Sequence, residues 1–337
     1  MWIFSKQTIV VVLGILLICV FRFSYFYETY ADDVGVVIDP DTKGYVNIAT
    51  NILEKGKYQR RPSLPETHRP PGYPLFLVLN FALFGQDNLL ATVIFQHVLF
   101  FLMLLMVGYL AFQMGGVIAL AIAVGLYALD FTTFYYTNEI LSEVLFSFFI
   151  ILAVFIFNLG MSSNSRWKHL FFLTGVTVTV GIFVRPVGMY LMYPLTIFVG
   201  VAAYLDSEDI GHSVKSALLF FLPWMLMGGA WYYYSYSVSG NWTFTYYEIA
   251  GVYTQRIVAV IKSSLAVDFE TAFRIAYERQ STTGSQFKTF FLIMFEHPWA
   301  AGKELMLDLG RLLFSPAQGH LKPYFPNVFG NQFSIEN

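Results

Sequence analysis

The stretch LATVIFQHVLFFLMLLMVGYLAFQMGGVIALAIAVGLYAL, residues 90–129, contains no Asp, Glu, Lys or Arg. A bilayer core needs about 20 mostly apolar residues per helix, and somewhat fewer when the ends are anchored. The stretch is therefore long enough for two crossings, at Leu90–Phe112 and Gly116–Leu129. Around it the charges are unevenly spread. The 115 residues from Leu90 to Tyr204 carry six, whereas the 62 residues from Glu28 to Leu89 carry fourteen. This alternation predicts a chain that passes repeatedly between lipid and water.

The overall composition agrees with a membrane protein. Of the 337 residues, 56% are hydrophobic and 12% are charged, whereas soluble domains carry about a quarter charged residues. The net charge of −2, with no basic stripe outside short loops, argues against nucleic acid as a partner. Cys19 is the single cysteine, so no internal disulfide can form.

Seven apolar runs are candidates for membrane crossings. They are Thr8–Tyr27, Leu90–Phe112, Gly116–Leu129, Val144–Leu159, Leu170–Val184, Val187–Tyr204 and Val214–Tyr234. The first follows Lys6 without a small-residue cleavage site after it, so we interpret it as an uncleaved anchor. Arg22 and the neighbouring aromatic residues are typical of an interfacial girdle. We expect an all-α integral membrane protein with about seven transmembrane helices, formed by residues 1–236, followed by a polar segment at 237–337.

Basic residues in short loops predict the orientation of such a chain. Arg166, Lys168 and His169 lie in a connection without acids, so that loop and the N-terminus are expected to be cytoplasmic. The acidic loop at Asp206–Asp209 gives no support, because acids count for little in this rule. The first loop, residues 28–89, the turn from Asp130 to Glu143, and everything after Tyr236 then lie on the extracytoplasmic side.

The first loop predicts two amphipathic juxtamembrane helices. Val46–Lys55 ends at Gly56 and has an apolar face of Ile48, Ala49, Ile52 and Leu53, which is typical of a helix lying on the membrane surface. Asp41 stands at its N-cap position, and capping alone is a sufficient explanation for it. Asp32, Asp33 and Asp39 are nearby, and spacing does not choose among the four acids. After the rigid turn at residues 68–74, a second helix is expected at Leu75–Phe84.

Two further features carry charge at the ends of spans. Glu139 and Glu143 are four residues apart at the mouth of a span, so they share one face if the helix has begun. Such carboxylates usually face a polar cavity, although Glu139 can also be solvated and Glu143 can reach the interface. Arg185 interrupts an apolar stretch and has a guanidinium suited to phosphate or carboxylate, or to a role as an interfacial anchor.

The order of these motifs resembles that of membrane glycosyltransferases that use polyprenyl-phosphate sugars. That family has the GT-C superfold and includes the protein O-mannosyltransferases and the aminoarabinose transferases of lipid A, of the glycosyltransferase family 39 type. The similar motifs are Asp41 with Tyr45, residues 69–77 with Gly85, Gln96, residues 140–146, Arg185-Pro186 and residues 222–224. The resemblance covers residues 1–231 and fades after Ser237, where family members commonly continue with further spans. We therefore expect residues 237–337 to be the start of a truncated variable module.

The resemblance implies transfer of a sugar from a polyprenyl-phosphate donor to a glycan, lipid or protein acceptor, outside a bacterial or archaeal cell membrane. Asp41 corresponds to the family's general base, and Glu143 is the second expected catalytic residue. The residues expected to bind substrate are Arg185, Tyr45, Glu139, Arg69 and Tyr73. Asp41 and Glu143 are also the expected ligands if a divalent cation, Mg²⁺ or Mn²⁺, takes part. The alternatives are a lipid or polysaccharide transporter and an inactive assembly subunit of the same fold.

Overall fold

The computed structural model describes residues 6–39, 41–61, 64–86, 88–162, 167–240, 242–283 and 286–314. They form two compact units, which divide between Trp242 and Thr243. This division lies close to the boundary expected after residue 236. Arg166, on which the predicted orientation partly depends, lies outside the described residues.

Six helices in the described part of the chain are long and apolar enough to cross a membrane, and all lie in the first unit. They are α1 (Lys6–Asp32), α4 (Leu89–Ala128), α6 (Glu143–Met161), α7 (Trp167–Val184), α8 (Met189–Ser207) and α9 (Ile210–Ser239). Large apolar side chains such as Leu17, Ile118 and Leu205 are exposed on their outer faces. So much exposed apolar surface is unfavourable in water and is typical of helices in contact with lipid. The prediction of an all-α membrane protein is therefore confirmed, without the number of crossings.

Helix α4 contains a break that divides it into two packed halves. Gly115 and Gly116 have non-helical dihedral angles, and Gly116 has a φ of 65°, which favours glycine. A Cβ built on Gly108 would lie 3.2 Å from Val124 Cγ2, so the second half returns along the first. The runs predicted at Leu90–Phe112 and Gly116–Leu129 lie on either side of this break. The number of membrane crossings, seven if both halves cross, stays a prediction.

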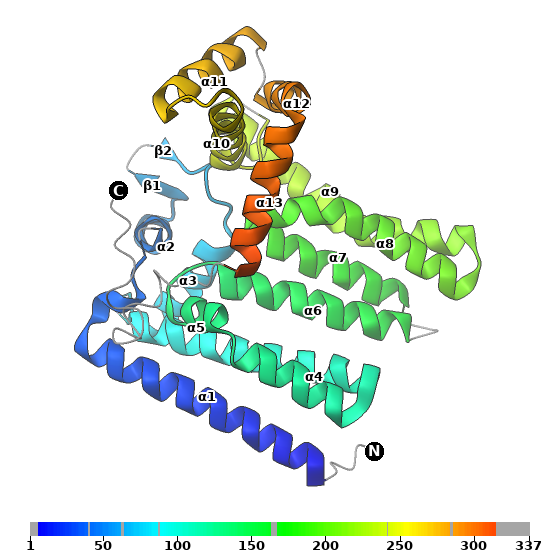
Figure 1. The fold of residues 1–337 in the computed structure, drawn as a ribbon. Coiled ribbons are helices and arrows are strands. Elements are labelled where there is room, and N and C mark those ends of the chain that lie inside the picture. Colours follow the sequence, from blue (N-terminus) through cyan, green and yellow to red (C-terminus); the bar gives the residue numbers. More distant parts are fainter. Residues whose placement is uncertain are drawn as a thin grey trace. The chain divides into compact units, whose positions relative to one another are not determined.

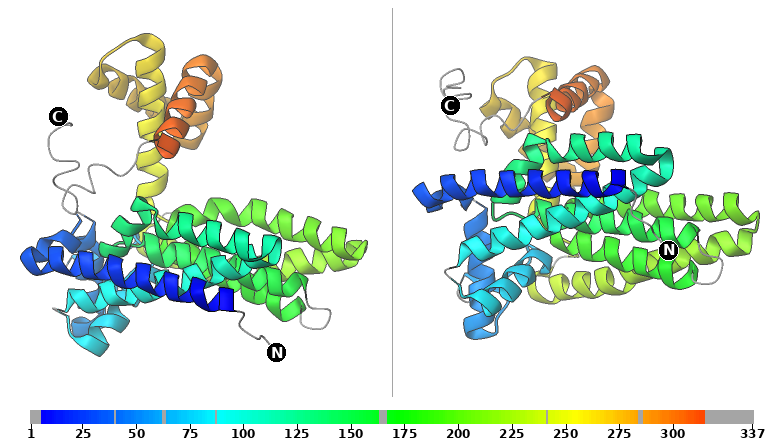
Figure 2. Two further views of the ribbon diagram at one scale, coloured as in Figure 1. Left: turned by 60° about the horizontal axis from the view of Figure 1, so that its bottom comes forward. Right: turned by 90° about the horizontal axis from the view of Figure 1, so that it is seen from below.

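The long helices run back and forth between two ends of the first unit (Figure 1). Helix α6 packs against α7, and α7 and α8 each pack against α9. Helix α1 lies alongside α4 in both views of Figure 2. Helices α7 and α9 approach each other closely, because a Cβ built on Gly175 would lie only 2.0 Å from the Phe220 carbonyl oxygen. Only glycine allows the two backbones to meet there.

The connections that carry the predicted site residues lie at one end of this bundle. The first connection contains η1 (Val34–Val37), α2 (Thr42–Lys55), the strands β1 (Gln59–Arg61) and β2 (Leu64–Pro65), and α3 (Gly72–Phe84). The second contains α5 (Phe131–Asn138), and the third contains η2 (Pro186–Gly188). Since α6 begins and α7 ends at this end, Glu143 and Arg185 are brought together by the antiparallel packing of two spans.

Three features of the first unit differ from the sequence expectations. The antiparallel pair β1–β2 was not predicted. Helix α3 is not amphipathic, because its exposed side carries Leu75, Leu79 and Leu83. Arg22, expected among the residues of an interfacial girdle, is buried against the bundle and is only 5% exposed. A hydrophobicity pattern does not reveal a buried arginine, because its partners lie far away in the sequence.

The described residues of the second unit form four helices, α10 (Tyr246–Leu265), α11 (Phe269–Thr283), α12 (Gln286–Glu296) and α13 (Pro298–Phe314). Its core holds Ile257, Ile261, Ala276 and Ile293, among others. In its described residues no helix has the length and hydropathy of a membrane span.

Candidate active site

Asp41 forms an ion pair instead of capping helix α2. Its side chain makes no cap hydrogen bond, and its Oδ1 lies 2.9 Å from Arg69 Nη2. Arg69 Nη1 also donates to the Asp41 carbonyl oxygen, at 3.3 Å. The Asp41 side chain remains 67% exposed. The explanation of Asp41 by capping alone therefore does not hold, and the carboxylate is open to solvent on one side.

Arg69 is held in place by the first turn of α2. Its guanidinium carbon lies 4.1 Å from the centre of the Tyr45 ring, a cation–π contact. A Cβ built on Gly44 would lie 2.9 Å from the same carbon, so only glycine leaves room for the guanidinium. The backbone amide of Arg69 donates to Glu66 Oε1 at 3.2 Å. Asp41, Gly44 and Tyr45 together bind the side chain of Arg69. The sequence did not indicate that Gly44 makes room for this guanidinium.

The first connection is fastened to the second by hydrogen bonds between their backbones and side chains. Thr42 Oγ1 donates to the Ile140 carbonyl oxygen at 3.0 Å, and the Ile140 amide donates to the Val37 carbonyl oxygen at 3.1 Å. The Tyr135 hydroxyl donates to Asp39 Oδ2 at 3.3 Å. Asp39 is one of the four acids among which spacing could not identify a catalytic residue. Its carboxylate accepts this hydrogen bond and another from the Asp41 amide, so its role here is structural.

Glu143 and Arg185 form the second ion pair of the site. Glu143 Oε1 contacts Arg185 Nη1 closely, and both side chains are partly exposed. The pair borders a cavity of about 370 Å³. The lining comes from α4, α5 and α6 together with Arg185, and consists of Met103, Tyr127, Thr132, Thr133, Tyr136, Glu143, Val144, Phe146, Ser147 and Arg185. The prediction that Glu143 faces a polar cavity agrees with this arrangement, and Asp41 does not line it.

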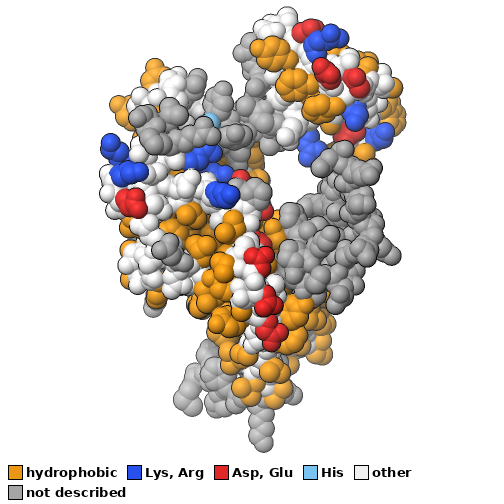
Figure 3. Space-filling view, turned by 90° about the vertical axis from the view of Figure 1, so that its left-hand side faces the viewer, with side chains coloured by type: hydrophobic (Ala, Val, Ile, Leu, Met, Phe, Trp, Pro, Cys, Tyr) orange, Lys and Arg blue, Asp and Glu red, His pale blue; other side chains and the backbone are white. Residues whose placement is uncertain are grey.

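Tyr45 lies between the two ion pairs. Its hydroxyl donates to Ser142 Oγ at 3.4 Å, and its ring supports Arg69. Burial raises the pKa of the Tyr45 hydroxyl, Arg69 and Ser142 oppose the rise, and Glu143 and Asp41 add to it. Tyr45 therefore stays a neutral hydrogen-bond donor, within electrostatic reach of both carboxylates. Figure 3 shows the end of the unit where these connections gather, with charged side chains of both signs among hydrophobic ones.

Tyr73 and Glu139, which were expected to bind substrate, lie beneath the surface. Tyr73 is fully buried, and its hydroxyl donates to Gln96 Oε1 at 3.0 Å. Gln96 Nε2 donates in turn to the carbonyl oxygens of Thr137 and Glu139, at 3.0 and 2.7 Å. The Glu139 side chain is buried as well, so it is not solvated. In this conformation both residues are buried under the site and join its connections through Gln96. Neither side chain is accessible to a substrate.

The two carboxylates do not fit a divalent cation as they stand. Asp41 is engaged with Arg69, and Glu143 is engaged with Arg185. Among the residues that the structure describes, no group of three His, Cys, Asp or Glu side chains is placed to hold a metal ion. A cation there would have to displace two guanidinium groups, so we assign no step to it. The need for a cation stays a prediction.

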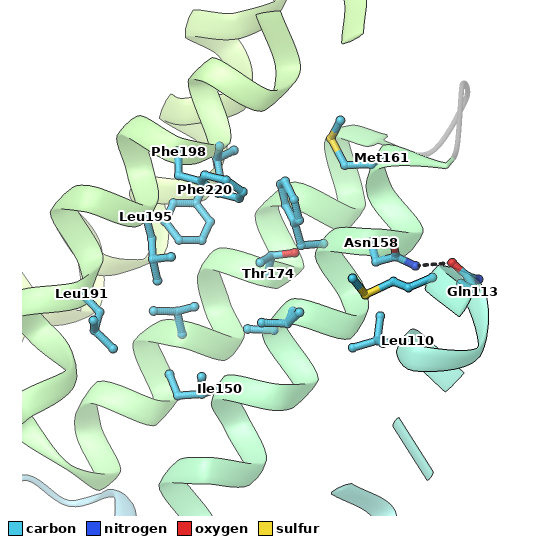
Figure 4. Close-up of a pocket in the computed structure, with 16 residues that line it drawn as sticks. Leu110, Gln113, Ile150, Asn158, Met161, Thr174, Leu191, Leu195, Phe198 and Phe220 are labelled. Carbon is cyan, nitrogen blue, oxygen red and sulfur yellow. Dashed lines mark hydrogen bonds between the residues drawn. The ribbon is translucent and has the colours of Figure 1, made fainter. Parts of the chain in front are cut away.

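A second, apolar cavity lies among the spans below the Glu143–Arg185 pair. It has a volume of about 700 Å³ and is lined by α4, α6, α7, α8 and α9 (Figure 4). Ile150 of α6 is seven residues beyond Glu143, which is about 10 Å along a helix. At the other end, Asn158 Nδ2 donates to Gln113 Oε1 at 3.0 Å. Its lining is mostly apolar, so the cavity can accept an apolar chain.

No family model, curated protein or solved structure matches the chain. The resemblance in the motifs therefore rests on the residues named above, and the function has to be argued from the geometry of the site. Sequence reasoning missed Asp39, Thr42 and Ser142 as residues that join the connections. Their contacts are between distant segments, so no local pattern could have revealed them.

Proposed function

We propose that the protein is an integral membrane glycosyltransferase that transfers a sugar from a polyprenyl-phosphate donor to an acceptor outside the cell membrane. The observation that carries the proposal is the meeting of two arginine–carboxylate pairs at Tyr45. The pairs Asp41–Arg69 and Glu143–Arg185 come from separate connections, and both remain open to solvent. The motif resemblance supplies the reaction class. The proposal includes seven crossings and a cytoplasmic N-terminus.

Asp41 is the proposed general base. In the reaction the acceptor hydroxyl loses its proton to the carboxylate while its oxygen forms a bond to the anomeric carbon of the sugar. Arg69 holds one carboxylate oxygen at 2.9 Å, which fixes the orientation of the group, and the 67% exposure of the side chain leaves it accessible to an acceptor.

Arg185 is the proposed partner of the departing phosphate. When the bond between the anomeric carbon and the phosphate oxygen breaks, the electron pair leaves with the phosphate and its negative charge grows. A guanidinium stabilises such charge by charge-assisted hydrogen bonds. Glu143 holds Arg185 in position until the phosphate arrives. The apolar cavity below this pair has the character needed for the polyprenyl chain.

The decisive experiment compares Asp41→Asn with Asp32→Asn, an exposed acid at the end of α1. Purified protein in liposomes is given a panel of synthetic polyprenyl-phosphate hexoses and pentoses with a membrane extract as acceptor, and release of polyprenyl phosphate is measured. Asp41→Asn should lose at least about 10²–10⁴-fold in rate, the usual contribution of a general base, while Asp32→Asn keeps the wild-type rate. Undiminished release by a folded Asp41→Asn protein would refute the assignment.

One observation favours an inactive assembly subunit as the second candidate. Each proposed catalytic carboxylate already has an arginine partner. Such ion pairs are also expected where the residues only stabilise the loops. Such a subunit would release no polyprenyl phosphate alone, and it would co-purify in a fixed ratio with an active partner. Release by the isolated chain excludes this alternative.

A further inference from the structure

A buried arginine in helix α1 stands apart from the proposed active site. Arg22 lies ten residues before the end of α1 and is 5% exposed. Its Nη1 donates to the Ala128 carbonyl oxygen at 2.7 Å, at the C-terminus of α4. Its guanidinium carbon lies 4.1 Å from the Phe100 ring centre and 5.2 Å from that of Phe134. These contacts stabilise the cation, but none of them supplies a full negative charge.

The remaining donors of Arg22 are unsatisfied. Nε and Nη2 are buried and have no hydrogen-bond partner among the described residues. Leaving a buried polar group unpaired costs about 1–3 kcal/mol, and more for a charged group. A charged residue within a membrane span usually faces a polar partner or marks a binding site. The two free donors therefore call for an anion.

Arg22 lines a cavity of about 720 Å³ at the outer side of the bundle. The lining is almost entirely apolar and consists of Leu17, Ile18, Phe21, Arg22, Tyr25, Ala128, Leu129, Asp130, Phe131 and Phe134. Leu17, Phe21 and Leu129 at its rim are strongly exposed on the faces that would meet lipid. The cavity shares no lining residue with the one at Glu143–Arg185 or with the apolar cavity among the spans.

One carboxylate also lines the cavity and has to be considered. Asp130 Oδ2 accepts hydrogen bonds from the Thr133 amide at 2.6 Å and from Thr133 Oγ1 at 2.5 Å, as the N-cap of α5. Asp130 makes no ion pair with Arg22, since their charged atoms are not within 4.0 Å of each other in this structure. Its capping bonds hold it to α5, so Asp130 does not satisfy the unpartnered donors of Arg22 in this structure.

We propose that this cavity binds a membrane phospholipid, with the lipid phosphate on Arg22 Nε and Nη2 and an acyl chain along the apolar lining. The guanidinium fork presents two donors to phosphate oxygens. The apolar lining distinguishes a lipid from a soluble anion, which would leave that surface in contact with water. Entry is from the side, over the exposed Leu17 and Phe21, so the ligand comes from the surrounding bilayer.

The test measures lipid binding by native mass spectrometry of the delipidated full chain in detergent. Phosphatidylglycerol, a diacylglycerol without phosphate, and inorganic phosphate are the three probes. We compare the wild type with Arg22→Gln, which removes the charge, with Leu17→Trp, which fills the cavity mouth without touching Arg22, and with Leu13→Trp. Leu13 is an exposed residue of α1 that does not line the cavity, so it is the matched control.

The wild type and Leu13→Trp should retain one phosphatidylglycerol more tightly than diacylglycerol. Loss of a charge-assisted hydrogen bond corresponds to about tenfold or more in affinity, so Arg22→Gln should bind at least that much more weakly. Leu17→Trp should weaken binding in a protein whose arginine is intact, which separates lost binding from misfolding. Equal phosphatidylglycerol affinity in all four proteins overturns the proposal. So does diacylglycerol bound as tightly as phospholipid, or inorganic phosphate that displaces phosphatidylglycerol.

Discussion

Replacement of Gly72 by alanine should disturb the whole candidate site from a position that carries no functional group. Gly72 is the first residue of α3 and lies against the C-terminal end of α7. A Cβ built there would lie 2.5 Å from the Val184 amide nitrogen and 2.6 Å from the carbonyl carbon and oxygen of Phe183. All three atoms belong to the backbone, so no side chain can turn away to make room.

The size of the effect follows from these distances. Ordinary Cβ contacts begin at 3.4 Å, so the start of α3 has to move by about 0.9 Å from α7 (3.4 − 2.5). Overpacking of this kind costs about 1–3 kcal/mol. For a unit of this size that corresponds to a fall of about 2–12 °C in melting temperature. Arg69 precedes α3 and Arg185 follows α7, so the displacement separates the two arginines. A misplacement of about 1 Å can reduce an enzymatic rate roughly 10²-fold.

The assay combines thermal unfolding in detergent with release of polyprenyl phosphate in liposomes. Gly229→Ala is the matched control, because a Cβ on Gly229 in α9 meets no atom within 4 Å. The control should be neutral or slightly more stable, by about 0.5–1 kcal/mol, because alanine is the better helix former. Equal melting temperatures for the two variants would refute the close approach of α3 to α7. A lower melting temperature with an unchanged rate would refute the link between that approach and the site.

Three further predictions concern the network around the site. Gly44→Ala should push the Arg69 guanidinium from its seat and lower the transfer rate about tenfold, with less than about 1 kcal/mol change in stability, as measured by activity and chemical unfolding. Gln96→Leu should destabilise the protein by about 2–4 kcal/mol, because it leaves the Tyr73 hydroxyl and two carbonyl oxygens buried without their partner, as measured by chemical unfolding. Burial raises the pKa of Tyr58 and Tyr73 well above the usual value near 10, so the unfolded chain releases these protons first and stability should fall as the pH rises beyond about 10. The tyrosinate absorbance of these two residues, obtained by difference from Tyr58→Phe and Tyr73→Phe variants, should appear only on unfolding.

The sequence was informative where a local pattern has a single physical explanation. Apolar runs of membrane length predicted the long helices, and the position of Glu143 and Arg185 at opposite ends of successive spans is what an antiparallel pair requires. Gly56 ends α2 in the left-handed conformation, as expected for a glycine at that place. The paired glycines of α4 could have been recognised as a turn, because a φ of 65° at Gly116 favours glycine.

Other features depend on contacts between distant segments, which no local pattern contains. Whether Tyr73 lines a site or lies below it depends on Gln96, which comes from another helix. The partner of Arg22 is the carbonyl of Ala128, 106 residues away. In both cases the residue type predicts that a polar contact is needed, and only the packing decides where the contact is made. For this reason the sequence identified the ion-pairing residues but not their pairs.

Arg69 and Arg185 of the candidate active site have partly exposed carboxylate partners, whereas Arg22 has none among the described residues. We therefore expect ligands to exchange at the active site and to stay bound at Arg22. Exposed ion pairs contribute about 0–1 kcal/mol, and the Asp41–Arg69 pair is of this kind because the Asp41 side chain is 67% exposed. The Glu143–Arg185 pair is partly exposed and borders a cavity. In the proposed reaction, Arg185 exchanges Glu143 for a substrate phosphate, which replaces the negative charge that Arg185 loses. Arg22 has no such freedom, because its surroundings are apolar and its free donors are buried. A ligand there is expected to stay bound and to act as part of the structure, whereas ligands at Arg185 are expected to turn over.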